Sequence, residues 1–324
     1  MRDITYRDAL NEALHEELER DSRVFVLGED VGSYGGPFQV CRGLYEKFGA
    51  RRVRDTPISE LGFTGIAVGA ALTGLRPVVE ILYIDFTALA MDQIVNQAAK
   101  LRYMYGGKAQ VPLVIRTQGG GGRGNAAQHS QSLEMWFVHT PGLVVMHPAT
   151  PHDAKGMLKW AIRSNDPVVF IEHKLLYGEK GPVPEEEYLI GAGSADVKRE
   201  GTDATVVAHS RMVHFSLVAA EKLAARGIEV EVIDPRTLKP LDAATILESV
   251  KKTGRLVVVS EGVRTGGFAS EVAAVMQDQA YDYLDAPILR VAAEDVPVPY
   301  AGELEMAALP SEHDIVAAVE SICR

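Results

Sequence analysis

The fold is decided by residues 78–105, which read VVEILYIDFTALAMDQIVNQAAKLRYMY. An almost continuous apolar run, Val78–Leu82, comes first, and apolar residues at helical spacing follow over Thr87–Tyr105. A continuous apolar run is typical of a strand that is buried on both faces, as in a parallel sheet covered by helices. The stretch therefore predicts a strand and then a helix in a parallel α/β sheet.

The same alternation recurs along the chain of 324 residues. Apolar runs predict further strands at Val24–Gly28, Val111–Arg116, Leu143–His147, Val168–Glu172, Ala204–His209, Glu229–Asp234, Arg255–Ser260 and Pro287–Val291. Periodic segments predict helices at Tyr6–Arg20, Phe63–Leu72, Asp153–Arg163, Met212–Arg226, Phe268–Ala280 and Glu312–Ile322, with Thr5 and Ser311 as caps. Strands that alternate with helices predict doubly wound α/β sheets.

A break in this alternation divides the chain. His173–Asp203 is polar, lacks periodicity and contains Pro182, Pro184 and the run Glu185–Glu187, as linkers do. We therefore expect a linker at about 175–203 between two domains, 1–190 and 191–324, a division that the length also favours.

Charge and cysteine content exclude several classes of protein. A formal net charge of −11 argues against non-specific binding of nucleic acid or anionic lipid. The two cysteines, Cys41 and Cys323, form neither a disulfide framework nor a metal-binding spacing, which fits a reducing compartment. Because no signal peptide and no apolar stretch of about 18 residues is visible, we expect no membrane span and a cytoplasmic location.

A carboxylate follows the segment Asp55-Thr56-Pro57-Ile58-Ser59. Pro57 disfavours helix at the residue before it, so Ser59 is expected to cap the next helix and Glu60 to lie in its first turn. The structural interpretation is a carboxylate stabilised by the helix dipole. The functional interpretation is a desolvated acid whose pKa rises above roughly 4.3, so that it exchanges protons.

An aromatic residue stands where the strand of residues 78–82 gives way to its helix. Phe86 is thereby placed at the C-terminal edge of the sheet, where open α/β folds bind their ligands. The ring is either part of the core or a surface on which a flat heterocycle stacks.

A glycine-rich run, residues 119–124, precedes a histidine. It contains G-x-G-x-x-G, but the next strand ends in His147-Pro148 instead of the acid that binds a ribose, which argues against a dinucleotide site. The run is either a mobile surface loop or a loop that closes near an active site. His129 lies just downstream among small polar residues, and it is either structural or catalytic.

Several motifs occur together and in order, and their combination is specific. They are Asp-Thr-Pro-Ile-Ser-Glu at 55–60, the Gly65–Gly69 helix, Asp92-Gln93-Ile94, Asn96-Gln97-Ala98, Ala-Ala-Gln-His-Ser-Gln at 126–131, Asp153-Ala154-Lys155-Gly156, Ile233–Thr237, Lys252–Arg255 and Gly266–Glu271. Over nearly the whole chain, this set resembles the β subunits of the thiamine-diphosphate-dependent first component of 2-oxo acid dehydrogenase complexes.

The resemblance implies a transketolase-like fold, with a pyrimidine-binding domain over 1–190 and a transketolase C-terminal domain over 191–324. It also implies oxidative decarboxylation of a 2-oxo acid and reductive acylation of a lipoyl group. Glu60 would hydrogen-bond the cofactor's aminopyrimidine ring and so help the thiazolium carbon to lose its proton. Phe86 would stack on the ring, Ile58 and Leu82 would line its pocket, and His129 would serve acyl transfer.

Two ion sites follow from the same resemblance. The family has a potassium site, and the matching positions, several of them backbone carbonyls, are Leu113, Ala161, Ile162, Ser164 and Asp166. Related enzymes hold magnesium and diphosphate through Gly-Asp-Gly, which does not occur here. An α subunit would therefore supply that half of the site, in a heterotetramer of two α and two β chains.

Two surfaces are candidates for partners. The small-residue helix Gly65–Gly74 would pack either against the α subunit or inside the chain's own core. The lipoate acyltransferase core would dock on the second domain near Asp282, Asp285 and Glu294, unless these charges are simply solvated.

The substrate and two other classes of function stay open. Phe86 favours pyruvate, with acetoin next, whereas branched-chain relatives tend to carry Tyr at that position. A self-sufficient thiamine enzyme would need Gly-Asp-Gly in the same chain. A catalytically silent scaffold is the non-enzyme alternative, and the presence of Glu60, Phe86 and His129 argues against it.

Overall fold

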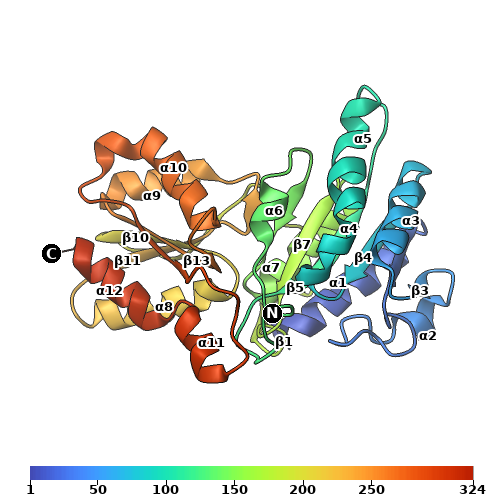
Figure 1. Ribbon diagram of the computed structural model, residues 1–324, viewed down its shortest axis with the longest axis horizontal. Coiled ribbons are helices and arrows are strands. Elements are labelled where there is room, and N and C mark those ends of the chain that lie inside the picture. The colour runs from blue at the N-terminus through green and yellow to red at the C-terminus, as the bar shows by residue number, and fades with distance from the viewer. Residues whose placement is uncertain (324) are drawn as a thin grey trace. The chain divides into compact units, whose positions relative to one another are not determined.

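The computed structural model describes residues 1–323. It divides into two compact units, of which the first comprises Met1–Gly119 and Trp136–Ala192. The second comprises Gly120–Met135 and the chain from Gly193 onward. Each unit contains its own sheet and helices (Figure 1).

A parallel sheet forms the centre of the first unit, with strands in the order β6-β7-β5-β4-β2-β3. Its central strands are buried along their whole length, as continuous apolar runs predict. The strands are β2 (Val24–Gly28), β3 (Val53–Asp55), β4 (Arg76–Ile81), β5 (Val114–Gly119), β6 (Val144–Met146) and β7 (Val168–His173).

Helices α1 (Tyr6–Arg20) and α7 (Pro151–Arg163) pack together against this sheet. Leu10, Leu14 and Met157 belong to the core that they share with Val26 and Val168 of the strands. The crossover helix α3 (Glu60–Leu72) packs against β4 and against α4 (Thr87–Met91), and α5 (Ala99–Met104) follows α4 along the chain. The smaller helices are α2 (Leu44–Phe48), α6 (Glu134–Val138), η1 (Ile84–Phe86) and the π-helical η2 (Asp92–Ala98).

The second unit has a five-stranded sheet in the order β14-β13-β10-β11-β9. All its neighbouring strands are parallel except β9, which pairs antiparallel with β11. Its strands are β9 (Asp196–Arg199), β10 (Ala204–Ala208), β11 (Val230–Asp234), β13 (Leu256–Val263) and β14 (Leu289–Ala293), and β12 (Thr237–Lys239) is a further short strand.

Helices cover both faces of the second sheet, with α9 and α10 on one side and α8 and α12 on the other (Figure 1). The helices are α8 (Arg211–Ala224), α9 (Ala243–Thr253), α10 (Phe268–Ala280), η3 (Tyr281–Tyr283), α11 (Gly302–Ala308) and α12 (Glu312–Ile322). The expected doubly wound α/β architecture is therefore confirmed.

Local sequence signals set several of the boundaries. Helices α1, α10 and α12 begin and end at the predicted residues. Thr5 accepts a hydrogen bond from the backbone N–H of Asp8, and Ser311 forms a capping box with Asp314. Ser59 occupies the N-cap position of α3, but its side chain makes no capping hydrogen bond.

Three predictions need correction. The segment expected to be a linker contains β8 (Lys180–Val183), which pairs antiparallel with β1 (Arg2–Thr5), and it also contains β9. The expected helix over residues 87–105 is interrupted by η2, because hydrogen bonding changes to the π pattern. The strand expected from Val111 begins at Val114, because Pro112 has no N–H to give to a ladder.

The segment Gly120–Met135 lies within the range 1–190 that was expected for the first domain, but it packs with the second unit. Glu261 and Glu305 of that unit accept hydrogen bonds from its backbone, which explains the difference.

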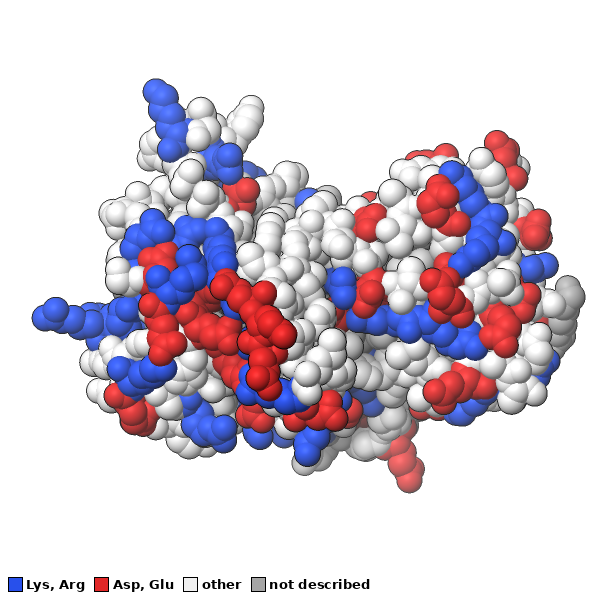
Figure 2. All heavy atoms as spheres, turned by 180° about the vertical axis from the view of Figure 1, so that it is seen from behind, with Lys and Arg blue, Asp and Glu red and all other residues white. Residues whose placement is uncertain are grey.

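Acidic side chains gather in the left half of the face shown in Figure 2, where basic side chains border them. In residues 1–323, no helix is both long and apolar enough to cross a membrane.

Candidate active site

The strand order of the first unit has a topological switch point between β2 and β4, the position at which open α/β sheets have their ligand crevice. The chain leaves β2 toward β3 on one side, and it leaves β4 toward β5 on the other side. In open α/β sheets, ligands bind at the carboxyl ends of the strands where the connections diverge in this way. Glu29 follows β2 directly, and Leu82–Phe86 follows β4.

Three carboxylates meet at this edge. Glu60 is the first residue of α3 and is only 5% exposed, and Glu80, near the end of β4, is 2% exposed. Burial raises the pKa of Glu29 to about 7, and the negative charges of Glu60, Asp30 and Glu80 contribute to that rise. Glu29 therefore holds a proton over much of the neutral range, beside the ionisable Glu60.

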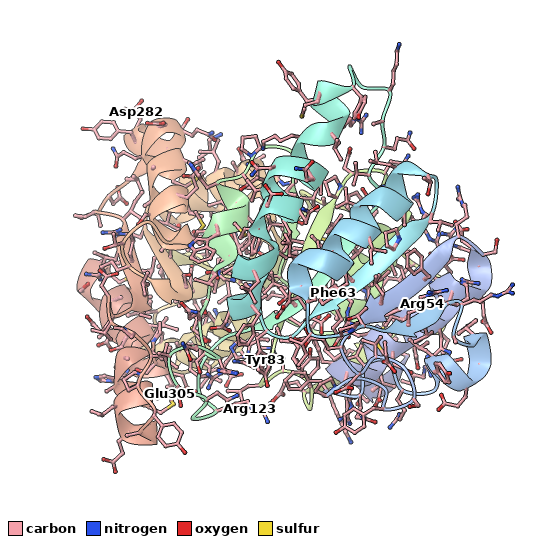
Figure 3. All side chains as sticks on the ribbon, turned by 45° about the vertical axis from the view of Figure 1, so that its right-hand side comes forward. Arg54, Phe63, Tyr83, Arg123, Asp282 and Glu305 are labelled. Carbon is pink, nitrogen blue, oxygen red and sulfur yellow. The ribbon has the colours of Figure 1, made fainter. Side chains whose placement is uncertain are left out.

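Aromatic and apolar side chains occupy the segments that follow β4 and precede α3. Phe86 ends η1, directly before α4, and Leu82 and Tyr83 are half-buried in the segment that follows β4. The Tyr83 side chain is shown in Figure 3. The Lys174 ammonium lies over the Tyr83 ring, 4.8 Å from its centre. Ile58 is 81% exposed, only two residues from the buried Glu60. This edge of the sheet thus combines buried carboxylates with apolar side chains, of which Ile58 is largely exposed.

A buried ion-pair network supports the crevice from within the sheet. The Arg116 guanidinium, 0% exposed, donates to Glu80 Oε2 at 2.7 Å and to both oxygens of Glu172 at 2.7 and 2.9 Å. Tyr177 donates its hydroxyl proton to Glu172 at 2.5 Å. Burial alone would lower the pKa of Arg116, but Glu172 and Glu80 hold it well above its usual value. The network therefore keeps a permanent positive charge under Glu80.

Cys41 also contacts this network, since its thiol lies 3.5 Å from Glu80 Oε2. Burial and the charge of Glu80 raise the pKa of the thiol well above its usual value. Because the thiolate is the nucleophilic form, Cys41 is a structural residue.

The glycine-rich loop belongs to the second unit, where carboxylates already occupy its N–H groups. Gly121 donates to Glu261 Oε1 at 2.6 Å, and Gly122 and Gly124 donate to the two oxygens of Glu305 at 2.8 Å each. Phosphate-binding loops offer such N–H groups to a ligand. Here they bind the protein's own acids, so the G-x-G-x-x-G pattern does not mark a dinucleotide site. His129 is half-buried on the same loop.

A cavity of about 540 Å³ lies beside this loop. Ser130, Gln131 and Leu133 line one part of it, and Val296, Pro297 and Leu309 line another.

A buried polar cluster lies beside the residues that line this cavity. His209 Nε2 is 3.3 Å from Ser260 Oγ and 3.9 Å from Glu134 Oε1. In a catalytic triad the serine and the acid bind opposite ring nitrogens, whereas here both face the same one. The cluster is therefore not a hydrolase triad. Burial raises the pKa of Glu134 to about 7, and the charge of Glu261 contributes.

The residues expected to bind potassium lie near the amino ends of the strands in the first sheet, at the opposite end from Glu60 and Phe86. Leu113 precedes β5, Ala161 and Ile162 lie in the last turn of α7, and Ser164 and Asp166 lie between α7 and β7. Arg76 donates to the carbonyl oxygens of Ile162 at 3.0 Å and Ser164 at 3.1 Å. Each carbonyl oxygen has a second lone pair that remains for a monovalent cation. A cation bound there would lie close to the positive charge of Arg76. In residues 1–323, no group of three or more His, Cys, Asp or Glu side chains is arranged to hold a metal ion.

Comparison with known proteins identifies the family. Residues 2–180 match the transketolase pyrimidine-binding domain, and residues 193–315 match the transketolase C-terminal domain. The chain is 50% identical over 326 residues to the mitochondrial pyruvate dehydrogenase E1 component subunit beta-1 of Arabidopsis thaliana, covering 99% of this chain and 90% of that protein. The chain belongs to the family of pyruvate dehydrogenase E1 β subunits.

Other members of the family agree. The E1 β subunit of Rickettsia felis is 49% identical over 320 residues, covering 99% of this chain and 98% of the relative. A solved structure described as a split gene transketolase, inactive beta4 tetramer, superposes with a TM-score of 0.82 at 26% identity and covers 99% of this chain. The resemblance to E1 β subunits and the transketolase-like fold are both confirmed.

The structure brings some of the predicted residues together. Glu60, Leu82 and Phe86 lie at the same edge of the sheet in the first unit, and the exposed Ile58 lies two residues before Glu60. His129 belongs to the second unit. Sequence reasoning missed Glu29, although an acid directly after a buried strand is a usable signal of a ligand-binding edge. It also missed Arg116, Glu261, Glu305 and Glu134, because their partners are distant in sequence.

Replacing Arg116 with Met should lower the free energy of unfolding by about 3–5 kcal/mol, because Glu80 and Glu172 stay buried without their cation. Urea denaturation of the purified variant measures this change. The control is Arg102→Met, which removes an ion pair to Asp166 whose side chains are 50% and 45% exposed. It should cost about 1 kcal/mol or less. Equal losses in the two variants would contradict the proposed role of the network.

Replacing Glu134 with Gln should change how stability depends on pH. The pKa of Glu134 is 4.5 when unperturbed and about 7 in the fold, so the folded state binds the extra proton between these values. The free energy of unfolding of the wild type should therefore fall as pH rises through this range, by about 3 kcal/mol in all from this group. The Gln variant should lack that part of the slope in urea denaturation.

Glu221→Gln changes an exposed carboxyl in the same unit and should leave the slope unchanged. A Glu134→Gln variant with the wild-type slope would show that Glu134 titrates as an exposed acid.

Proposed function

We propose that this chain is the β subunit of a pyruvate dehydrogenase, which catalyses oxidative decarboxylation of pyruvate and reductive acylation of a lipoyl group. The observation that carries the proposal is the set of buried acids at the diverging strand connections, beside an aromatic ring. It occurs in a chain about half identical to pyruvate dehydrogenase E1 β subunits.

The crevice residues fit one face of a thiamine diphosphate site. Bound there, the cofactor supplies the electron sink for decarboxylation of a 2-oxo acid. Glu60 would hydrogen-bond a nitrogen of the aminopyrimidine ring, and its burial at the start of α3 would keep water away from that bond. Phe86 stacks on the ring, and Ile58 and Leu82 line its pocket.

His129 serves the later step, in which the acyl group passes to the lipoyl carrier. Histidine is the side chain that enzymes use most often for proton transfer. The loop that bears it is fixed to the second unit by Glu261 and Glu305, so its backbone has a defined geometry. A fixed proton donor or acceptor is what an acyl transfer requires.

An α subunit completes the site. The sequence lacks Gly-Asp-Gly, so the α subunit holds the diphosphate and the magnesium ion. The outward face of α3 supports this assignment, because Leu61, Ile66 and Leu72 are 50%, 66% and 41% exposed beside Gly62 and Gly65. An exposed apolar helix face with small residues is a surface for close helix packing. The proposed assembly is a heterotetramer of two α and two β chains.

The lipoate acyltransferase core is the second proposed partner. Asp282, Asp285 and Glu294 are all exposed in the second unit, and Asp282 lies just beyond α10 (Figure 3). Tyr281 and Tyr283 flank Asp282 and are 68% and 48% exposed. Asp282 and Asp285 precede β14, whereas Glu294 follows it at the other end. The acidic and aromatic side chains near Asp282 fit a basic binding module.

Reconstitution tests the whole proposal. The purified chain alone should neither bind thiamine diphosphate tightly nor turn over pyruvate. Co-expression with its α partner should give pyruvate-dependent dye reduction. The solved split gene transketolase, described as an inactive beta4 tetramer, is a precedent for an inactive half. In the assembled enzyme, Glu60→Gln should lower the rate of dye reduction about a hundredfold or more, because the carboxyl no longer exchanges a proton.

Glu46→Gln is the matched control, since Glu46 is an exposed acid in the first turn of α2. It should keep the wild-type rate. Full activity of the isolated chain would refute the shared site, and wild-type turnover by the Glu60 variant would refute the role of that acid.

The potassium site is a separate proposal with its own test. If Leu113, Ala161, Ile162, Ser164 and Asp166 bind potassium, the assembled enzyme should unfold at a higher temperature in KCl than in NaCl of equal ionic strength. Binding to the folded state alone raises the midpoint, here by about 2 °C or more. Equal midpoints in the two salts would remove potassium from the proposal.

A further inference from the structure

Helix α11 buries a single side chain, and it is an acid. Glu305 is 2% exposed, whereas the neighbouring Leu304 and Met306 are 61% and 47% exposed. This reverses the usual arrangement, in which the apolar side chains of a helix face the core. Burying a carboxylate costs free energy unless hydrogen bonds replace its water. Glu305 therefore needs hydrogen-bond donors that stabilise its buried carboxylate.

The partners are backbone N–H groups of the glycine-rich loop. Both oxygens of Glu305 are used, one by Gly122 and the other by Gly124, at 2.8 Å each. Arg123, between these glycines, and Glu305 lie near each other in Figure 3. Gly122 and Gly124 have φ of +91° and +68°, a conformation that glycine adopts without strain. Their positive φ lets two nearby N–H groups face one carboxylate, which gives strong charge-assisted hydrogen bonds.

The loop is closed at its base and held at a second point. The N–H of Gly120 donates to the carbonyl of Gln131 at 3.1 Å, which brings the two ends together. Gly121 donates to Glu261 and approaches Leu309 so closely that an added Cβ would lie 2.8 Å from its side chain. Such a loop is a compact Ω-type segment rather than a mobile surface run.

His129 belongs to this closed loop, two residues before its base at Gln131. Its N–H donates to the carbonyl of Ala126 at 3.4 Å, and Ala126 itself has φ of +61°. A left-handed alanine is unfavourable and persists only where surrounding contacts enforce it. The hydrogen bonds to Glu305 and Glu261 are such contacts, and they lie in the same loop.

We infer that Glu305 is a positioning residue that holds the His129 loop in the geometry needed for acyl transfer. The inference rests on the proposed role of His129 and adds the residue through which that role is maintained. Glu305 touches neither substrate nor cofactor in this proposal; it acts through the backbone of Gly122 and Gly124.

The chemistry of the side chain predicts a graded series of variants. A carboxylate offers two acceptor oxygens, whereas the amide of Glu305→Gln offers one and turns an N–H donor toward the other glycine. Glu305→Ala offers none. Loop order should therefore decrease from wild type to Gln to Ala. Glu303→Gln, on the exposed side of the same helix, is the matched control and should behave as wild type.

Hydrogen exchange measures the loop directly in the enzyme assembled with its α partner. Amide exchange in peptides that span residues 120–131 should be faster in Glu305→Gln and fastest in Glu305→Ala, with the rest of the chain unchanged. Unchanged exchange in both variants would overturn the inference. If the Ala variant does not assemble, the Gln variant gives the same test.

Two rates then separate positioning from general stability. Dye reduction reports decarboxylation, and reductive acylation of a free lipoyl domain reports acyl transfer. In Glu305→Ala, acyl transfer should fall about tenfold or more, because misplacement of a catalytic group by a small distance is costly. Dye reduction should fall much less. Equal losses in both rates would mean a merely structural role and would overturn the inference.

A double variant completes the test. If Glu305 acts through His129, adding Glu305→Ala to His129→Ala should cause no further loss of acyl transfer, whereas independent roles would give additive losses. The result with His129→Ala alone also separates the two proposals. Wild-type acyl transfer in that variant would refute the role of His129, and the exchange data would still decide whether Glu305 holds the loop.

Discussion

The Arg116 guanidinium is the point on which the first unit depends. It is buried between Glu80 of β4 and Glu172 of β7 while belonging to β5, so one cation joins three adjacent strands. A lone buried carboxylate is costly, and Arg116 forms ion pairs with two carboxylates next to the crevice. The remaining acids, Glu29 and Glu60, stand at the same edge without such a cation, and Glu29 responds by holding its proton. The buried ion pairs of Arg116 thus lie beside Glu29, which exchanges a proton near neutral pH.

The two units use buried acids for different purposes. In the first unit, carboxylates cluster at a sheet edge, where burial and the neighbouring negative charges raise the pKa of Glu29. In the second, Glu261 and Glu305 accept hydrogen bonds from backbone N–H groups and so give a loop its shape. The glycine-rich pattern is common to this loop and to phosphate-binding loops because both need N–H groups that converge on an anion. Here the anion is part of the chain.

Much of the fold follows from local patterns, and less of the site does. Continuous apolar runs such as Val24–Gly28 predict buried parallel strands, and the Ser311 capping box predicts the start of α12, because both signals lie within a few residues. The position of Glu60 could be predicted for the same reason, since Pro57 and Ser59 indicate the start of a helix. The pairings of Glu305 with Gly122 and of Arg116 with Glu172 join residues that are far apart in sequence. No local pattern encodes them, so they appear only in the folded chain.

The outward face of α3 has a consequence for how such a protein is made in a cell. A copy that leaves the ribosome without its partner presents leucine and isoleucine side chains to water, and chaperones and proteases act on such surfaces. Surplus copies would be lost to aggregation or degradation. In the proposed assembly, where the α subunit covers this face, synthesis of the two chains in matched amounts would protect each copy.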